Sequence, residues 1–299
     1  MSVTLLALLL PPCAPTAQAD ATVTDDALLL TVQAATLRNR VLVVPENTTD
    51  VILEIGCSDR NTADDEVLPT SKHSFLLAFE PLLDKYALLL AKGTHRYHGG
   101  AKDRAVPLGH HHQRGVILPL AVSQHGGPLT FHVNEIAGCS GLKAVALENH
   151  FACKHALETR HVPSISLEAA LGLVPSHLPI SLLKIDAEGV DFNVLATTPA
   201  TVLRRVRHLH FEFHIGDADS SGLCPGLYAG LPRCEEILAH MSLVGFIVTS
   251  FSSVSTGPIR PTNNSTLTCN HLLTPFRRDR HGSPVCGYDV DMSHNKYLN

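Results

Sequence analysis

The apolar positions of this chain fall into short uninterrupted runs that alternate with stretches of helical spacing. The runs Asp50–Ile55, Ser74–Phe79 and residues 182–186 show almost no polar alternation, which is typical of strands buried on both faces. Apolar residues recur every three or four positions at residues 82–92 and 234–244, and this spacing predicts helices. Strands that alternate with helices favour a parallel sheet with helices on both faces.

Further runs extend the same pattern toward both ends of the chain. A short helix is expected at residues 27–37, a strand within residues 115–122 and another at residues 208–214. Residues 246–251 and 265–272 predict two final strands, joined by a loop rich in Pro, Gly and Asn that suits a hairpin. The expected fold is therefore α/β, with an open, mostly parallel sheet, an antiparallel C-terminal hairpin and helices on both faces.

Length and composition fit one large domain. The 299 residues are 44% hydrophobic, which is enough for a single core, and we find no internal repeat or low-complexity linker. We expect the domain to span residues 20–280. A secretory signal peptide at residues 1–19 is expected before it, and a polar tail at residues 281–299 after it.

The signal peptide is indicated by a short apolar core at residues 5–10, which Pro11 ends. Ala17-Gln18-Ala19 then has the small-x-small form of a cleavage site. No Lys or Arg precedes the core, so an N-terminus without a targeting role is the alternative. This core and all later apolar runs are too short to cross a bilayer. We therefore expect a protein of the secretory-pathway lumen or the exterior, or of the cytoplasm under the alternative, with no membrane span.

Cysteines and sequons agree with a secreted protein. Removing Cys13 with the signal leaves seven of the eight cysteines, and their spacing suggests three bridges with Cys57 free, although sequence does not determine connectivity. The suggested bridges are Cys139–Cys153, Cys224–Cys234 and Cys269–Cys286. Glycosylation sequons begin at Asn47, Asn263 and Asn264. The alternative is a cytosolic protein in which all seven cysteines are reduced.

Charge and aromatic content argue against a nucleic-acid partner. The formal net charge is −5, so no basic surface is implied. Trp is absent and aromatic residues make up 5% of the chain, which disfavours a surface that stacks bases. A small molecule or a glycan remains as the expected partner.

The most informative segment is the acidic turn at Asp186 and Glu188, between the buried strand at residues 182–186 and the helix that follows. In open α/β sheets, ligands bind at the carboxyl ends of parallel strands. Two carboxylates at such a turn suggest catalysis or the binding of a polar ligand. The alternative is that Glu188 and Asp191 only favour the positive end of the next helix.

The first two strands end in residues typical of a nucleoside site. Glu54 and Gly56 close the first strand, where glycine permits close approach of the backbone, and Glu80 closes the second, where a carboxylate can accept both hydroxyls of a ribose. Gly56 is not followed by the further glycines of the G-x-G-x-x-G fingerprint, which cradles a pyrophosphate. A nicotinamide oxidoreductase is thus disfavoured, whereas a nucleoside cofactor without phosphates is allowed.

Four sequence blocks together resemble the FkbM family of S-adenosylmethionine-dependent methyltransferases. They are EIGCSDRNT, FEPLLDKY, SLLKIDAEGVDFNVL and HLHFEFH, and the resemblance extends over residues 41–273. KIDAEG, at residues 184–189, is the most family-specific part. The resemblance implies a class I methyltransferase sheet with strand order 3-2-1-4-5-7-6, S-adenosylmethionine as methyl donor, and O-methylation of sugar or polyketide hydroxyls.

The same resemblance assigns roles to individual residues. Cofactor-binding residues are implied at Glu54, Gly56, Glu80 and Glu188, and Glu212 matches the acid that ends the next strand. The family usually has a further glycine where this chain has Arg60. Hydroxyl or amide contacts from three nearby residues could compensate for that departure, namely Ser58, Asn61 and Thr62.

Transfer of a methyl group from a sulfonium to an alcohol requires in-line placement of the reactants and a base for the departing proton. Asp186 is the first candidate base. Glu212 or a histidine is the second.

His210, Glu212 and His214 alternate along the strand at residues 208–214 and therefore share one face. Two histidines and a carboxylate can hold a metal ion. The interpretation we prefer is that they line the polar end of the sheet and position the substrate, so we assign no metal ligand.

The expected function is an S-adenosylmethionine-dependent O-methyltransferase that acts on a hydroxyl of a glycan or small molecule. The alternative is a secreted, non-catalytic binding protein on the same fold. The missing glycine at Arg60 favours the alternative, whereas the retained Glu80, Asp186 and Glu188 favour the enzyme.

Overall fold

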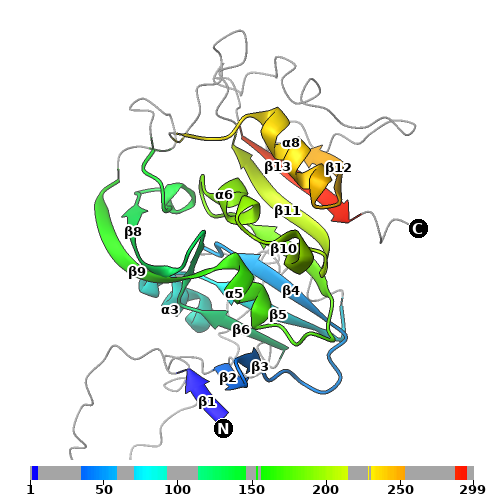
Figure 1. The fold of residues 1–299 in the computed structure, drawn as a ribbon. Helices are drawn as coiled ribbons and strands as arrows, with labels where there is room; N and C mark the ends of the chain where they lie inside the picture. The colour runs from blue at the N-terminus through cyan, green and yellow to red at the C-terminus, as the bar shows by residue number, and fades with distance from the viewer. Residues whose placement is uncertain are drawn as a thin grey trace, which may run out of the picture.

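A seven-stranded sheet in the order β12-β13-β11-β10-β4-β5-β6 forms the centre of the molecule, and β13 is the strand that runs antiparallel to its neighbours (Figure 1). Its strands are β4 (Asp50–Ile55), β5 (Ser74–Phe79), β6 (Gly115–Leu118), β10 (Ile180–Ile185), β11 (Val206–His214), β12 (Phe246–Ser252) and β13 (Gly287–His294). This computed structural model describes residues 2–5, 35–58, 71–92, 114–145, 153, 156–214, 228, 230–252 and 287–294.

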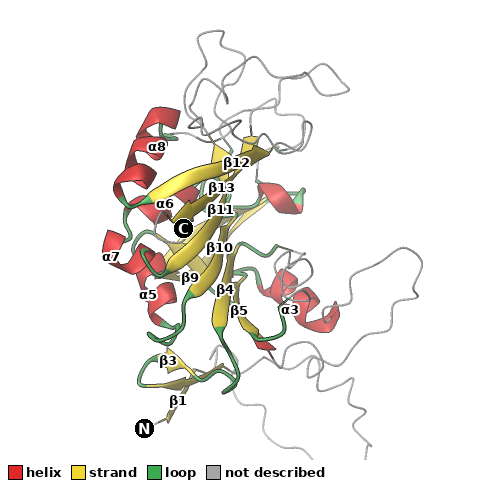
Figure 2. Cartoon of the chain, turned by 90° about the vertical axis from the view of Figure 1, so that its right-hand side faces the viewer, coloured by secondary structure: helices red, strands yellow, loops and turns green. Residues whose placement is uncertain are grey.

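Helices cover both faces of this sheet, as Figure 2 shows, with α3 on one side and α5, α6, α7 and α8 on the opposite side. The helices are α3 (Leu83–Lys92), α5 (Leu167–Gly172), α6 (Asp191–Ala196), α7 (Ala200–Leu203) and α8 (Cys234–Leu243). Burial on both faces explains the uninterrupted apolar run of β4. Leu53 packs into the large core cluster that includes α5 and α6, whereas Ile52 points the other way, toward Tyr86 of α3.

Two smaller sheets flank the central one. The strands β1 (Ser2–Leu5), β2 (Ala35–Arg38) and β3 (Val41–Leu42) form an antiparallel sheet, and β7 (Ala121–Ser123), β9 (Glu158–Ser166) and β8 (Gly127–Val133) form the other. The strand expected within residues 115–122 is divided between β6 and β7, with Pro119 between them. Proline has no N–H to donate to a sheet, which accounts for the break.

The mixed α/β architecture expected from the sequence is confirmed, but two local predictions are wrong. The helix expected at residues 27–37 does not extend over Ala35–Arg38, which form strand β2. The polar tail expected at residues 281–299 contains β13, which pairs with β11 and β12 on either side. Pairing on both edges satisfies the backbone hydrogen-bonding groups of β13. Met292 of this strand adds a side chain to the core, with 1% of its surface exposed to solvent.

The antiparallel partner of β12 is thus β13, and the second strand predicted for the hairpin, residues 265–272, lies outside the described part of the chain. The predicted disulfide Cys139–Cys153 is present, and Cys57 is free and buried, as expected. Cys234 is also disulfide-bonded. Its suggested partner Cys224 lies outside the described residues, as do Cys269, Cys286, Asn263 and Asn264.

At the N-terminus, β1 belongs to the segment expected to be a signal peptide, and it pairs with β2. This pairing does not test cleavage, and the signal peptide stays a prediction. Asn47, the sequon residue that the structure describes, lies exposed in a turn. Among the described residues, every helix falls short of the length and apolar character that a bilayer crossing requires.

Candidate active site

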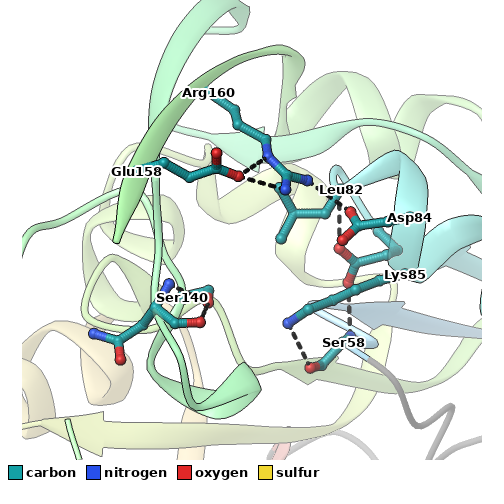
Figure 3. Close-up of polar contacts among 9 residues, drawn as sticks. Ser58, Leu82, Asp84, Lys85, Ser140, Glu158 and Arg160 are labelled. Carbon is teal, nitrogen blue, oxygen red and sulfur yellow. Dashed lines mark hydrogen bonds and ion pairs between the residues drawn. The ribbon is translucent and has the colours of Figure 1, made fainter. Parts of the chain in front are cut away.

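A cavity of about 380 Å³ lies at the carboxyl ends of the adjacent strands β6, β5, β4 and β10. This volume falls within the range typical of small-molecule sites. Figure 3 shows Ser58 and Lys85 on one side of an open space and Ser140 on the other, and all three line the cavity. The β7-β9-β8 sheet adds apolar lining through Ala121, Val122 and Phe131, so the site combines an apolar wall with polar groups at the strand ends.

Glu80 follows β5 and is held by two backbone groups. The N–H of Ser58 donates to its Oε2 at 2.7 Å and the N–H of Leu82 donates to its Oε1 at 2.9 Å. The side chain lines the cavity although the residue is 3% exposed. Burial raises the pKa of Glu80 to about 7, and the Leu82 N–H, the Lys85 ammonium and the Ser58 N–H partly offset that rise.

This pKa makes stability depend on pH in the ligand-free protein. Between about pH 4.5 and pH 7 the folded protein keeps a proton on Glu80 that the unfolded chain releases, so the free energy of unfolding decreases as pH rises. Relative to Glu80→Gln, we expect wild type to lose on the order of 3 kcal/mol across this window. Urea unfolding of both proteins from pH 5 to pH 8 measures the difference, and a constant difference would contradict the prediction.

Gly56 allows the end of β4 to touch the end of β10. Its φ is +79°, and a Cβ added there would lie 1.8 Å from the carbonyl oxygen of Asp186. Its N–H donates to the Phe79 carbonyl of β5 at 3.1 Å, so the turn joins three strand ends. Ser58 follows with φ +53°, and its hydroxyl accepts a hydrogen bond from Lys85 at 3.1 Å. The other two residues expected to compensate for Arg60, namely Asn61 and Thr62, lie outside the described residues.

Glu54 differs from its expected role because it does not reach the cavity. It is fully buried in β4, and its Oε1 lies 3.3 Å from the ammonium of Lys184 on β10. Lys184 does line the cavity, and its ammonium is also 3.4 Å from Asp186 Oδ2. A buried carboxylate next to a cation is a supporting ion pair. Glu54 therefore lies beneath the cavity and pairs with Lys184, which lines it.

The acidic turn after β10 is shaped by Asp191. This buried carboxylate accepts hydrogen bonds from the N–H of Ala187 at 2.9 Å and the N–H of Gly189 at 3.1 Å. Glu188 takes φ +52° between them, a left-handed conformation that is uncommon for a residue with a Cβ. Glu188 and Asp191, the two acids that could have served only to start the helix, thus have different roles. Asp191 holds the turn, whereas Glu188 lines the cavity together with Asp186.

Three carboxylates converge at this turn. One oxygen each from Asp186, Glu188 and Glu212 lies within 4.8 Å of the others, and Tyr228 donates to Glu188 Oε2 at 2.6 Å. Burial, followed by the charges of Glu212 and Asp186, raises the pKa of Glu188 well above its usual value. A carboxyl that keeps its proton can donate a hydrogen bond, whereas Asp186 beside Lys184 can accept a proton. Such a trio could hold a hard cation, but acidic groups also cluster without one, and we assign no metal ligand.

The histidine set on β11 does not form as one group. His210 Nδ1 lies 2.8 Å from Oδ1 of Asp291, its partner on β13, while Glu212 lies with the acidic turn. The side chain of His214 lies outside the described atoms. His210 is therefore paired with Asp291 of β13, whereas Glu212 groups with Asp186 and Glu188.

A disulfide-bonded loop covers the acidic turn. Cys139 is bonded to Cys153, and the neighbouring Gly138 and Ser140 line the cavity. A Cβ added at Gly141 would lie 2.7 Å from the Cβ of Glu188, so the loop and the turn are in close contact. Nothing local in the sequence marks Ser140 or Tyr228 as site residues. Lys184 could have been recognised from the sequence, because a charged residue is unusual in the apolar run of β10.

Comparison with known proteins relates this chain to methyltransferases. An antibiotic-related methyltransferase matches with 10% identity and TM-score 0.34, over 92% of this chain and 96% of that chain. A mutant of the 16S rRNA (adenine(1408)-N(1))-methyltransferase from Catenulisporales acidiphilia matches with 11% identity and TM-score 0.36, over 86% and 97%. No curated protein sequence matches. The model of the methyltransferase FkbM domain matches residues 50–248, most of the chain and every strand end around the cavity, so the chain belongs to the FkbM methyltransferase family.

Proposed function

We propose that this protein is an S-adenosylmethionine-dependent O-methyltransferase whose acceptor is a hydroxyl of a glycan or a small molecule. One observation carries the proposal: the carboxyl ends of β5, β4 and β10 bring Glu80, Gly56 and Asp186 to a single cavity. Family membership supports methyl transfer, and the geometry supports the division of that cavity into a nucleoside side and a reaction side.

The topology supports a class I methyltransferase fold. Numbered 1 to 7 along the chain, the strands of the central sheet are β4, β5, β6, β10, β11, β12 and β13. Read from the β6 edge, their order is 3-2-1-4-5-7-6, with the seventh strand antiparallel. This is the order that the sequence resemblance implies, and in such sheets ligands bind beyond the carboxyl ends of the strands.

The cavity residues suit a sulfonium nucleoside. The Glu80 carboxylate, held by two backbone N–H groups, would accept the hydroxyls of the ribose, and the absence of a side chain at Gly56 leaves room beside it. The bound cofactor supplies an activated methyl group. Asp186 would orient the acceptor hydroxyl and take its proton, which makes the oxygen a better nucleophile. Ser140, on the opposite side of the cavity, can donate or accept a hydrogen bond to the acceptor.

A secretory-pathway location fits the same features. The Cys139–Cys153 disulfide favours an oxidising compartment, and the exposed Asn47 begins a glycosylation sequon. We therefore expect the signal at residues 1–19 to be cleaved and the acceptor to be available in that lumen. N-terminal sequencing of the protein secreted by cultured cells tests this, since an intact Met1 would contradict it.

Two measurements on the full chain test the proposed function. Calorimetric titration with S-adenosylmethionine should show binding at one site, and a screen with labelled methyl donor against free sugars, glycans and small alcohols should label an acceptor. The matched control is Glu80→Gln, which should weaken binding because it replaces a charged acceptor of the ribose hydroxyls. Absence of binding in wild type would favour the non-catalytic binding protein instead.

A further inference from the structure

Lys184 is a cation inside a strand of the central sheet. Its side chain is 12% exposed, and its ammonium lies 3.3 Å from Glu54 Oε1 and 3.4 Å from Asp186 Oδ2. It lies two residues before Asp186, which directly follows β10, and the two side chains are in contact. In the parallel register it is the direct partner of Glu54 on β4. One ammonium thus connects a buried acid with the acid at the cavity.

Neutralisation of the Glu54 charge does not explain why the Lys184 ammonium contacts two carboxylates. A fully buried carboxylate needs one cation, and an ammonium in contact with Glu54 alone would meet that need. Lys184 instead also contacts Asp186, whose side chain is 41% exposed and would be solvated without help. The charges of Glu54 and Asp186 together outweigh burial and raise the pKa of Lys184, so it stays charged at neutral pH. The second contact therefore acts on Asp186.

Asp186 lies next to two further carboxylic acids. Glu188 on its own turn and Glu212 on β11 each bring a carboxylate oxygen within 4.8 Å of it. Negative charges within this cluster disfavour ionisation of its members, as the raised pKa of Glu188 shows, and the same effect acts on Asp186. An ammonium at 3.4 Å opposes this effect and restrains the side chain of Asp186.

We propose that Lys184 is a positioning residue that directs the Asp186 carboxylate into the cavity and keeps it ionised beside Glu188 and Glu212. This role rests on the proposed function, since it assumes that Asp186 acts on the acceptor. Lys184 itself need not touch the substrate, because its ammonium is already occupied by two carboxylates.

Three variants separate positioning from structural support. Lys184→Met removes the ammonium that lies beside the buried Glu54, so it should lower both the urea midpoint and kcat. In Lys184→Met/Glu54→Gln the buried charge is removed as well, so the urea midpoint should recover while kcat stays about 10- to 100-fold low. Lys184→Arg keeps a cation and should recover most of both. The dissociation constant for S-adenosylmethionine should stay within about twofold of wild type in the double variant, because Glu80 and Gly56 are untouched.

Two further measurements report the ionisation of Asp186 directly: the pH dependence of kcat and the pH titration of its carboxyl carbon. The acid limb of kcat, and the titration of the Asp186 carboxyl carbon followed by ¹³C NMR, should both move to higher pH in Lys184→Met, and by less in the double variant. Recovery of kcat together with the midpoint in the double variant would reduce Lys184 to structural support. An unmoved Asp186 titration would overturn the proposal whether or not a methyl acceptor has been found. If wild type transfers no methyl group while that titration moves, the proposed function fails and the coupling of Lys184 to Asp186 stands.

Discussion

Asp186→Asn binds S-adenosylmethionine as tightly as wild type but transfers methyl groups at least about 100-fold more slowly. We expect this result because the amide keeps the shape and most hydrogen bonds of the carboxylate but cannot take the proton of an alcohol. Cofactor affinity should survive, since the groups on the nucleoside side, Glu80 and Gly56, follow other strands. Calorimetry and single-turnover labelling measure the two quantities separately.

Glu168→Gln is the matched control for this change. Glu168 is an exposed carboxylate in the first turn of α5 and does not line the cavity, so the same carboxylate-to-amide change there should leave turnover unchanged. Full turnover in Asp186→Asn would remove the residue from the role of base. Glu212 would then become the candidate, because its carboxylate lies in the same acidic cluster.

The strand ends around the cavity were predictable from sequence because they follow runs with a clear physical signature. β4 and β5 are buried on both faces, so their apolar residues are continuous and the polar residues after them mark the sheet edge. Glu80 and Asp186 were recognisable for this reason. Glu54 was not, since a carboxylate at the end of an apolar run looks the same whether it faces a cavity or pairs with Lys184 beneath it.

β13 shows a different limit. Tyr288, Val290 and Met292 alternate with polar residues, which is the period of a strand, but the overall polarity of the segment favoured a tail. Its position between β11 and β12 is set by pairing with residues far away in sequence, and no local pattern carries that information. The same holds for Tyr228, whose contact with Glu188 spans 40 residues.

Gly56→Ala should be the most damaging single-methyl change in the described part of the chain, lowering the free energy of unfolding by on the order of 3 kcal/mol and preventing cofactor binding. An alanine pays about 1–2 kcal/mol for the left-handed backbone at φ +79°. Its Cβ would also overlap the Asp186 carbonyl oxygen at 1.8 Å, and neither partner is a flexible side chain that could move aside. Separation of β4 from the acidic turn would move the residues at the ends of β4 and β10 that line the cavity, and cofactor binding would be lost.

Gly230→Ala is the control that measures the cost of the left-handed backbone conformation alone. Gly230 has φ +66°, close to that of Gly56, but a Cβ there would have no atom within 4 Å. It should therefore lose only about 1 kcal/mol and keep cofactor affinity. Urea unfolding and calorimetric titration of both variants measure the contrast. Equal losses would mean that the left-handed conformation alone accounts for Gly56, and that close approach of β4 to β10 is not what shapes the site.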